Sequence, residues 1–158
     1  MTRPFLTACL ACAILGVGGC GDLEVVSASY ATLDEARKAG AVDQGWMPDG
    51  LPQGAHDIRE AHDPKTSRRW ALFSFPVSQA STLKSLLEDR ETSLEGQAVD
   101  APARIEWWPL LLRGRLDADR LRDTGLRLYR SADGKLLFAV NWSQGRAYYW
   151  TPPVGGMS

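Results

Sequence analysis

Residues 126–151, LRLYRSADGKLLFAVNWSQGRAYYWT, decide the fold of this chain because they hold three strand-like runs in succession. The three runs cover 126–130, 135–142 and 146–151. Glycine-containing turns separate the runs, as in antiparallel hairpins. In the middle run, alternate apolar residues share one face, by the two-residue repeat of a strand: Leu136, Phe138, Val140 and Trp142. The segment therefore predicts a three-stranded antiparallel meander.

Two further strands are predicted upstream, over 55–62 and 68–75, with a turn between them that begins at Asp63. The second strand has apolar residues on both faces from Trp70 to Phe73, which is typical of a strand covered on both sides. The first strand is mostly polar, so we expect it at an edge of the sheet. A short strand over 105–108, ended by a proline, and a loop over 91–102 complete the prediction.

Short helices are expected at two or three places. Thr32 and Glu35 have the spacing of a capping box, and Gly40 can adopt the left-handed conformation that ends a helix. Three leucines at i, i+3 and i+4 make one apolar stripe further along the chain. The predicted helices cover 33–39, 81–90 and, as one or two turns, 117–124. Helices packed on one face of an antiparallel sheet define an α+β fold.

The amino terminus has the pattern of a bacterial export signal. Arg3 precedes an uncharged apolar run over 5–17, which is shorter than the roughly 20 residues that a membrane-spanning helix needs. The run ends in Val17-Gly18-Gly19-Cys20, which resembles the lipobox of bacterial lipoproteins. This resemblance implies cleavage before Cys20 and acylation of its thiol. Ordinary signal cleavage that leaves a free thiol is the alternative.

Four segments follow: a signal peptide over 1–19, a tether over 20–30, one domain over 31–153 and a flexible tail over 154–158. Both other cysteines leave with the signal peptide, so the mature chain has no internal disulfide. We expect the anchor to hold the domain in the bacterial envelope, facing the periplasm, at an inner or an outer membrane. With 18 basic and 19 acidic residues, the chain lacks the excess of positive charge that is typical of a nucleic-acid-binding protein.

One stretch, from Thr32 to Phe75, resembles a group of small bacterial envelope proteins with a YbbD-like head domain. The resemblance rests on these residues: Ala36, Gly40, Gly45-Trp46-Met47-Pro48, Leu51-Pro52, Ala55, Asp57-Ile58, Glu60, His62-Asp63, Thr66, Trp70, Phe73 and Phe75. It covers under a third of the chain and implies an envelope location. It implies no catalytic residue.

Both histidines of the chain lie in one polar stretch of the first upstream strand. His56, Glu60 and His62 would share a face, and two imidazoles with a carboxylate suit zinc or a similar ion. However, His56 and His62 would lie roughly 20 Å apart along an extended strand. The candidate cluster is therefore Glu60, His62 and Asp63. The structural alternative is that Asp63 caps the turn while Glu60 and Arg59 are edge-strand charges.

Three functions compete. The first is a non-catalytic module that contacts an envelope protein or the cell wall, with no cofactor. The second is a metal-dependent or hydrolytic enzyme that uses the Glu60, His62 and Asp63 cluster, although the sequence contains no serine elbow or phosphate loop. The third is glycan binding by exposed tryptophans among Trp46, Trp107 and Trp108.

Overall fold

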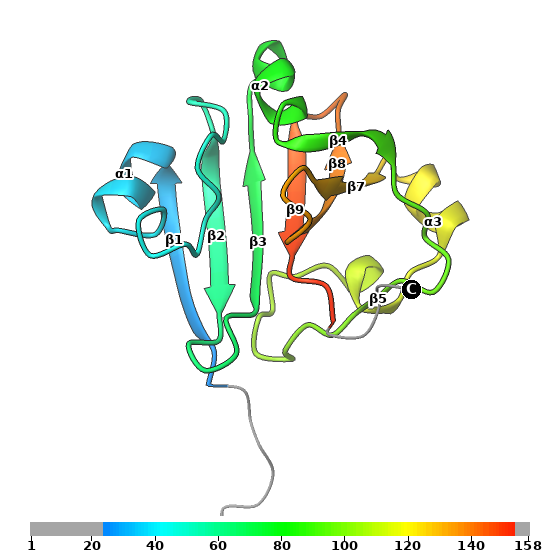
Figure 1. Cartoon of the computed structure of the whole chain (residues 1–158), viewed down its shortest axis with the longest axis horizontal. Coiled ribbons are helices and arrows are strands. Elements are labelled where there is room, and N and C mark those ends of the chain that lie inside the picture. Colours follow the sequence, from blue (N-terminus) through cyan, green and yellow to red (C-terminus); the bar gives the residue numbers. More distant parts are fainter. Residues whose placement is uncertain (1–23, 154–158) are drawn as a thin grey trace, which may run out of the picture.

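The computed structural model describes residues 24–153, and the predicted signal peptide, Cys20 and the tail 154–158 lie outside that range. Most strands join one antiparallel sheet in the order β1-β2-β3-β9-β8-β7-β4 (Figure 1). Its strands are β1 (Val26–Thr32), β2 (His56–His62), β3 (Arg69–Ser74), β4 (Leu87–Glu91), β7 (Arg127–Ser131), β8 (Leu137–Asn141) and β9 (Arg146–Trp150). A second ladder pairs β5 (Ala98–Val99) with β6 (Gly114–Arg115). The helices are α1 (Leu33–Lys38), α2 (Ala80–Lys84) and α3 (Ala118–Asp123).

The predicted carboxyl-terminal meander is confirmed. Strands β7, β8 and β9 pair antiparallel, and Phe138 of β8 lies opposite Tyr129 on one side and Tyr149 on the other. Two glycines with positive φ, Gly134 at +74° and Gly145 at +63°, make the connecting turns. The turn at Gly145 places β9 beside β8. The other edge of β9 pairs with β3 near the middle of the sheet.

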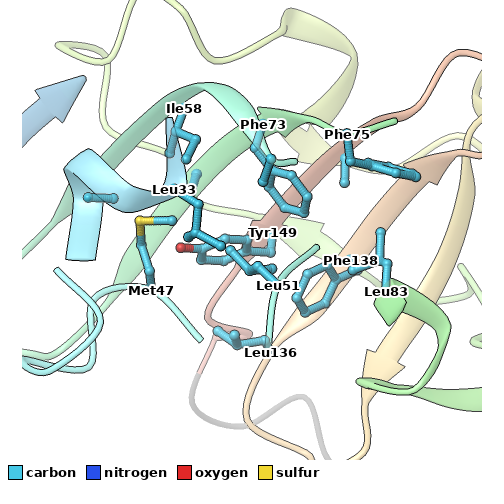
Figure 2. Packing of buried hydrophobic residues seen from close by; sticks show 14 of the residues in the cluster. Leu33, Met47, Leu51, Ile58, Phe73, Phe75, Leu83, Leu136, Phe138 and Tyr149 are labelled. Atoms are coloured by element: carbon cyan, nitrogen blue, oxygen red, sulfur yellow. The ribbon is translucent and has the colours of Figure 1, made fainter. Parts of the chain in front are cut away.

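The central strands of the sheet are buried on both faces. On one face, alternate residues such as Phe73, Phe138 and Tyr149 pack against Leu33 of α1 and Leu83 of α2 (Figure 2). On the other face, the remaining side chains of the same strands form a second core cluster with α3 and the segment before it. The strands contribute Trp70, Leu137 and Trp150, and the covering segment contributes Trp108, Leu112 and Leu121. The α+β class is confirmed, but the expectation that the helices pack on one face is wrong, because Leu121 of α3 belongs to the cluster on the second face. The double burial predicted for β3 is confirmed as well.

The predicted tether over 20–30 is wrong in its second half, because residues 26–32 form β1. This strand pairs with β2 along its length, from Val26 opposite His62 to Thr32 opposite His56. β1 therefore occupies the sheet edge, and the expectation that the following strand lies at an edge is wrong. Only small or half-buried side chains of β1 face the interior, so its sequence lacks the apolar alternation that marks a strand.

Two other elements differ from the prediction. The helix expected over 81–90 ends at Lys84, and Leu87 begins β4, whose pairing with β7 closes the other sheet edge. Gln79 is the N-cap of this helix and makes no side-chain capping bond. Residues 105–108 form turns in place of a strand. Ile105 and Trp108 reach the second core cluster from those turns.

Helix capping explains the ends of α1 and α3. The Glu35 amide donates to the Thr32 hydroxyl, as the capping box predicts, while the Glu35 carboxylate accepts from the Ala31 amide at 2.9 Å rather than from Thr32. Gly40 follows α1 with φ +82°, as expected. Asp117 caps α3 by accepting two backbone amides. Within residues 24–153, no helix is both long and apolar enough to cross a bilayer.

Candidate functional site

The predicted polar cluster lies on β2, one strand in from the sheet edge. A bulge interrupts β2 between His56 and Arg59, and Asp57 adopts φ +49° there. His56 precedes the bulge and remains exposed, where its Nδ1 donates to the Gly54 carbonyl at 2.9 Å. Glu60 and His62 follow the bulge and are 2% and 8% exposed. The structure thus brings Glu60 and His62 together and leaves His56 outside.

Glu60 and His62 form a buried pair on the face of the first core cluster. Nδ1 of His62 lies 3.0 Å from Oε2 of Glu60, so the imidazole donates when the carboxylate is ionised. The Trp46 indole stacks on the His62 ring with centroids 3.7 Å apart and planes 7° from parallel. Burial raises the pKa of the Glu60 carboxyl, and the hydrogen bond and charge of His62 oppose that rise. Glu60 is therefore a core group, and describing it as an edge-strand charge is wrong.

The loop that carries Trp46 is held down on this pair by two side chains from distant strands. Arg69 of β3 donates to the Gly45 carbonyl, and the Tyr149 hydroxyl of β9 donates to the Trp46 carbonyl at 3.1 Å. Burial raises the pKa of Tyr149 far above its ordinary value, so that hydroxyl keeps its proton. The Met47 side chain then inserts into the first core cluster (Figure 2). The pair is thus covered by a fixed loop.

Asp63 begins the β2–β3 turn and uses both carboxylate oxygens within it. Oδ1 accepts from the Lys65 amide at 2.9 Å, and Oδ2 accepts from the Thr66 hydroxyl at 2.7 Å. These hydrogen bonds lower the pKa of Asp63. They are the contacts that a turn-capping aspartate makes.

A metal centre would need further ligands beyond this pair. In the part of the chain that the structure describes, no group of three or more His, Cys, Asp or Glu side chains is placed to hold a metal ion. With the oxygens of Asp63 turned to its own loop, Glu60 and His62 would supply only two protein ligands. Three protein ligands are usual at a catalytic zinc.

The three candidate tryptophans have different surroundings. Trp108 is 2% exposed, and its Nε1 donates to the Leu112 carbonyl at 2.7 Å, so it is a core residue. Trp46 is half-buried and covers His62. Trp107 is half-buried too, but it lines a hollow on the second face of the sheet. Trp107 shares the lining of this hollow with three charged residues, Asp57, Arg59 and Arg146.

Sequence reasoning identified Glu60 and His62 and missed the residues that cover them. Trp46, Arg69 and Tyr149 come from a loop and two strands, and Tyr149 lies 103 residues from the carbonyl that it binds. No local spacing links them, because the contact depends on the order in which β3 and β9 pair. In the sequence Arg59 has the pattern of an ordinary surface charge, but in the structure it lines the same hollow as Trp107.

Comparison with known proteins gives one family. The YbbD head domain matches residues 24–74, which comprise β1, α1, the Trp46 loop, β2 and β3. No curated protein and no solved structure gives a significant match. The resemblance seen from Thr32 to Phe75 is thereby confirmed and extended to β1. Residues 24–74, which contain Glu60, His62 and Asp63, are thus similar to a YbbD head domain.

Proposed function

We propose that this chain is a lipid-anchored protein of the bacterial envelope, with a periplasmic domain that binds a partner and does not catalyse a reaction. The observation that carries the proposal is the position of Cys20. It ends an apolar run of signal-peptide length and lies six positions before Val26, the first residue of β1. The match to the YbbD head domain begins within that interval, at residue 24.

The short interval limits how far the domain can stand from its anchor. Six residues span at most about 20 Å when fully extended. The start of β1 and the β2–β3 turn lie at the same end of the sheet (Figure 1), and Lys65 of that turn pairs with Glu24 at 2.9 Å. An acylated Cys20 would therefore hold this end of the sheet near the bilayer, with α1 and α2 further away.

A binding role is supported by the way in which the candidate catalytic groups are used. His62 is paired with Glu60 and covered by Trp46, and Asp63 is committed to its turn. A general acid or base must reach the proton that it transfers in a substrate complex. In this structure His62 supports the Trp46 loop and Asp63 stabilises the β2–β3 hairpin.

Membrane attachment of a Cys20→Ser variant tests the proposal. Wild-type protein should fractionate with membranes, and its mature amino terminus should be an acylated Cys20 by mass spectrometry. The variant should lose the acyl chains and become extractable without detergent, since stable attachment takes more than one chain. Cys12→Ser is the matched control, because it removes a thiol from the apolar run and should leave attachment unchanged. An unmodified thiol, or a Cys20→Ser protein that stays as firmly bound, would refute the anchor.

A further inference from the structure

The second face of the sheet is open at its outer strands. Ser29 of β1 and Arg59 of β2 lie opposite each other in register, and both are exposed. Leu72 of β3 follows in the same row. Beside this row, the side chain of Trp107 and that of Arg146 from β9 complete the lining of a hollow of about 550 Å³. That volume falls within the roughly 300–1,000 Å³ of small-molecule pockets.

Two guanidinium groups supply the positive charge of the hollow. The side chain of Arg59 makes no hydrogen bond or ion pair with any residue between 24 and 153. Arg146 lies two strands away, a lateral distance of roughly 10 Å, and its Nη1 is positioned by the Ser74 hydroxyl at 2.7 Å. A planar guanidinium recognises a carboxylate through paired N–H donors, and a free one in a hollow remains available for that contact.

Trp107 supplies an apolar wall next to these charges. Its ring meets that of Trp108 edge-on, with centroids 6.0 Å apart and planes at 70°. Trp108 is itself fixed in the second core cluster by the hydrogen bond to Leu112. The indole of Trp107 is thus pre-organised, which reduces the entropy that a ligand must overcome on binding.

Asp57 places a single carboxylate at the same hollow. It is a non-glycine residue at φ +49° in a bulge, and bulges and left-handed residues are found disproportionately beside functional sites. A carboxylate accepts hydrogen bonds from hydroxyl groups and repels a compact multiple anion such as phosphate. Asp57 and Ser29 can both form hydrogen bonds with the hydroxyl groups of a ligand. The hollow therefore combines two cationic side chains, one anionic side chain, a serine hydroxyl and an aromatic wall.

We propose that this hollow binds a carbohydrate that carries a carboxylate. Such a ligand has an apolar ring face for Trp107, hydroxyl groups for Asp57 and Ser29, and a negative charge for Arg59 and Arg146. The inference rests on residues between 29 and 146 and is independent of Cys20, so failure of the anchor and failure of the hollow are distinguishable.

Titration of the detergent-solubilised full chain with trigalacturonate and with glucuronic acid tests the proposal, followed by calorimetry and tryptophan fluorescence. Saturable binding is expected for the acidic sugars, with clearly weaker binding of glucose and of inorganic phosphate. Arg59→Gln should weaken binding about tenfold or more, since it removes a charge-assisted contact while leaving the packing intact. Trp107→Phe should abolish the fluorescence change, because Trp107 is the one tryptophan among the residues that line the hollow.

Arg90→Gln is the matched control, because Arg90 is an exposed arginine on β4 at the opposite edge of the sheet. It should bind as the wild type does. Thermal unfolding of each variant establishes that the fold is retained. The proposal is overturned if no acidic sugar binds in the millimolar range, if Arg59→Gln and Arg90→Gln behave alike, or if glucose binds equally well. Preferential binding of phosphate or of an acidic peptide would equally overturn the carbohydrate class.

Discussion

Glu60 and Asp63 lie three residues apart, yet their surroundings shift their pKa values in opposite directions. Burial beneath the Trp46 loop raises the pKa of Glu60, because the charged form loses its solvation. Hydrogen bonds from Thr66 and the turn amides lower the pKa of Asp63, because they favour the charged form. A shifted pKa makes folding stability depend on pH, and the direction of the shift fixes the sign.

Glu60→Gln and Asp63→Asn should therefore change the pH dependence of stability in opposite ways. The folded-state pKa of Glu60 is above its ordinary 4.5, so its contribution is fully present below pH 4.5 and is lost as pH rises through the folded value. That of Asp63 is below its ordinary 3.8, so its contribution is present above pH 3.8 and is lost as pH falls.

Urea unfolding of the three proteins at several pH values between about 3 and 7 measures both effects. Relative to Glu60→Gln, the wild type should lose free energy of unfolding as pH rises above 4.5. Relative to Asp63→Asn, it should lose free energy as pH falls below 3.8. Parallel curves for wild type and Glu60→Gln would mean that the buried carboxyl does not titrate differently in the folded state.

At the scale of elements, the β8–β9 turn is tied to the end of β3 by Gly145. The Phe75 amide donates to the Gly145 carbonyl at 2.7 Å. Gly145 has φ +63°, and a Cβ there would lie 2.1 Å from the Phe75 carbonyl oxygen, a backbone atom that cannot rotate away. Gly134 makes the neighbouring β7–β8 turn with φ +74°, but a Cβ there would meet nothing within 4 Å.

Gly145→Ala should consequently destabilise the protein more than Gly134→Ala. Both substitutions carry the cost of a left-handed alanine, roughly 1–2 kcal/mol. Only Gly145→Ala adds a backbone clash, and we expect an extra loss of at least about 1 kcal/mol in the free energy of unfolding. Equal losses, measured by urea unfolding of the two variants, would show that the β8–β9 turn can shift away from Phe75 at little cost.

The elements that could be predicted are those whose local pattern has one interpretation. Strand β8 has apolar residues on both faces between two glycine turns, and α1 carries its cap and its terminating glycine. The run from Leu83 to Leu87 fits a helix and a strand alike, and only pairing with β7 selects β4. The Trp46 loop that covers Glu60 and His62 is held by contacts between residues far apart in the sequence. The hollow at Arg59 is likewise formed by residues from several strands, so no sequence spacing predicts either feature.

For the whole molecule, the largest difference from the sequence interpretation is that β1 belongs to the domain. It covers the outer edge of β2, the strand that holds the buried Glu60–His62 pair, and its Tyr30 packs on the first core cluster. Thr32 at its end caps α1. The link between Cys20 and the fold is then only a few residues long, so the proposed anchor would fix the sheet edge and not merely the general position of the domain.

Chains that begin at residue 24 and at residue 33 should therefore differ sharply in folding. The longer chain retains β1 and should unfold cooperatively, as a small single domain does. The shorter chain leaves the β2 edge unpaired, deprives α1 of its cap and uncovers core residues, each of which is destabilising. We expect its cooperative thermal transition, followed by circular dichroism, to be lost or to fall far below that of the longer chain. If both chains unfold at the same temperature, residues 26–32 act as a tether after all, and an anchor at Cys20 would leave the domain free to move well away from the bilayer.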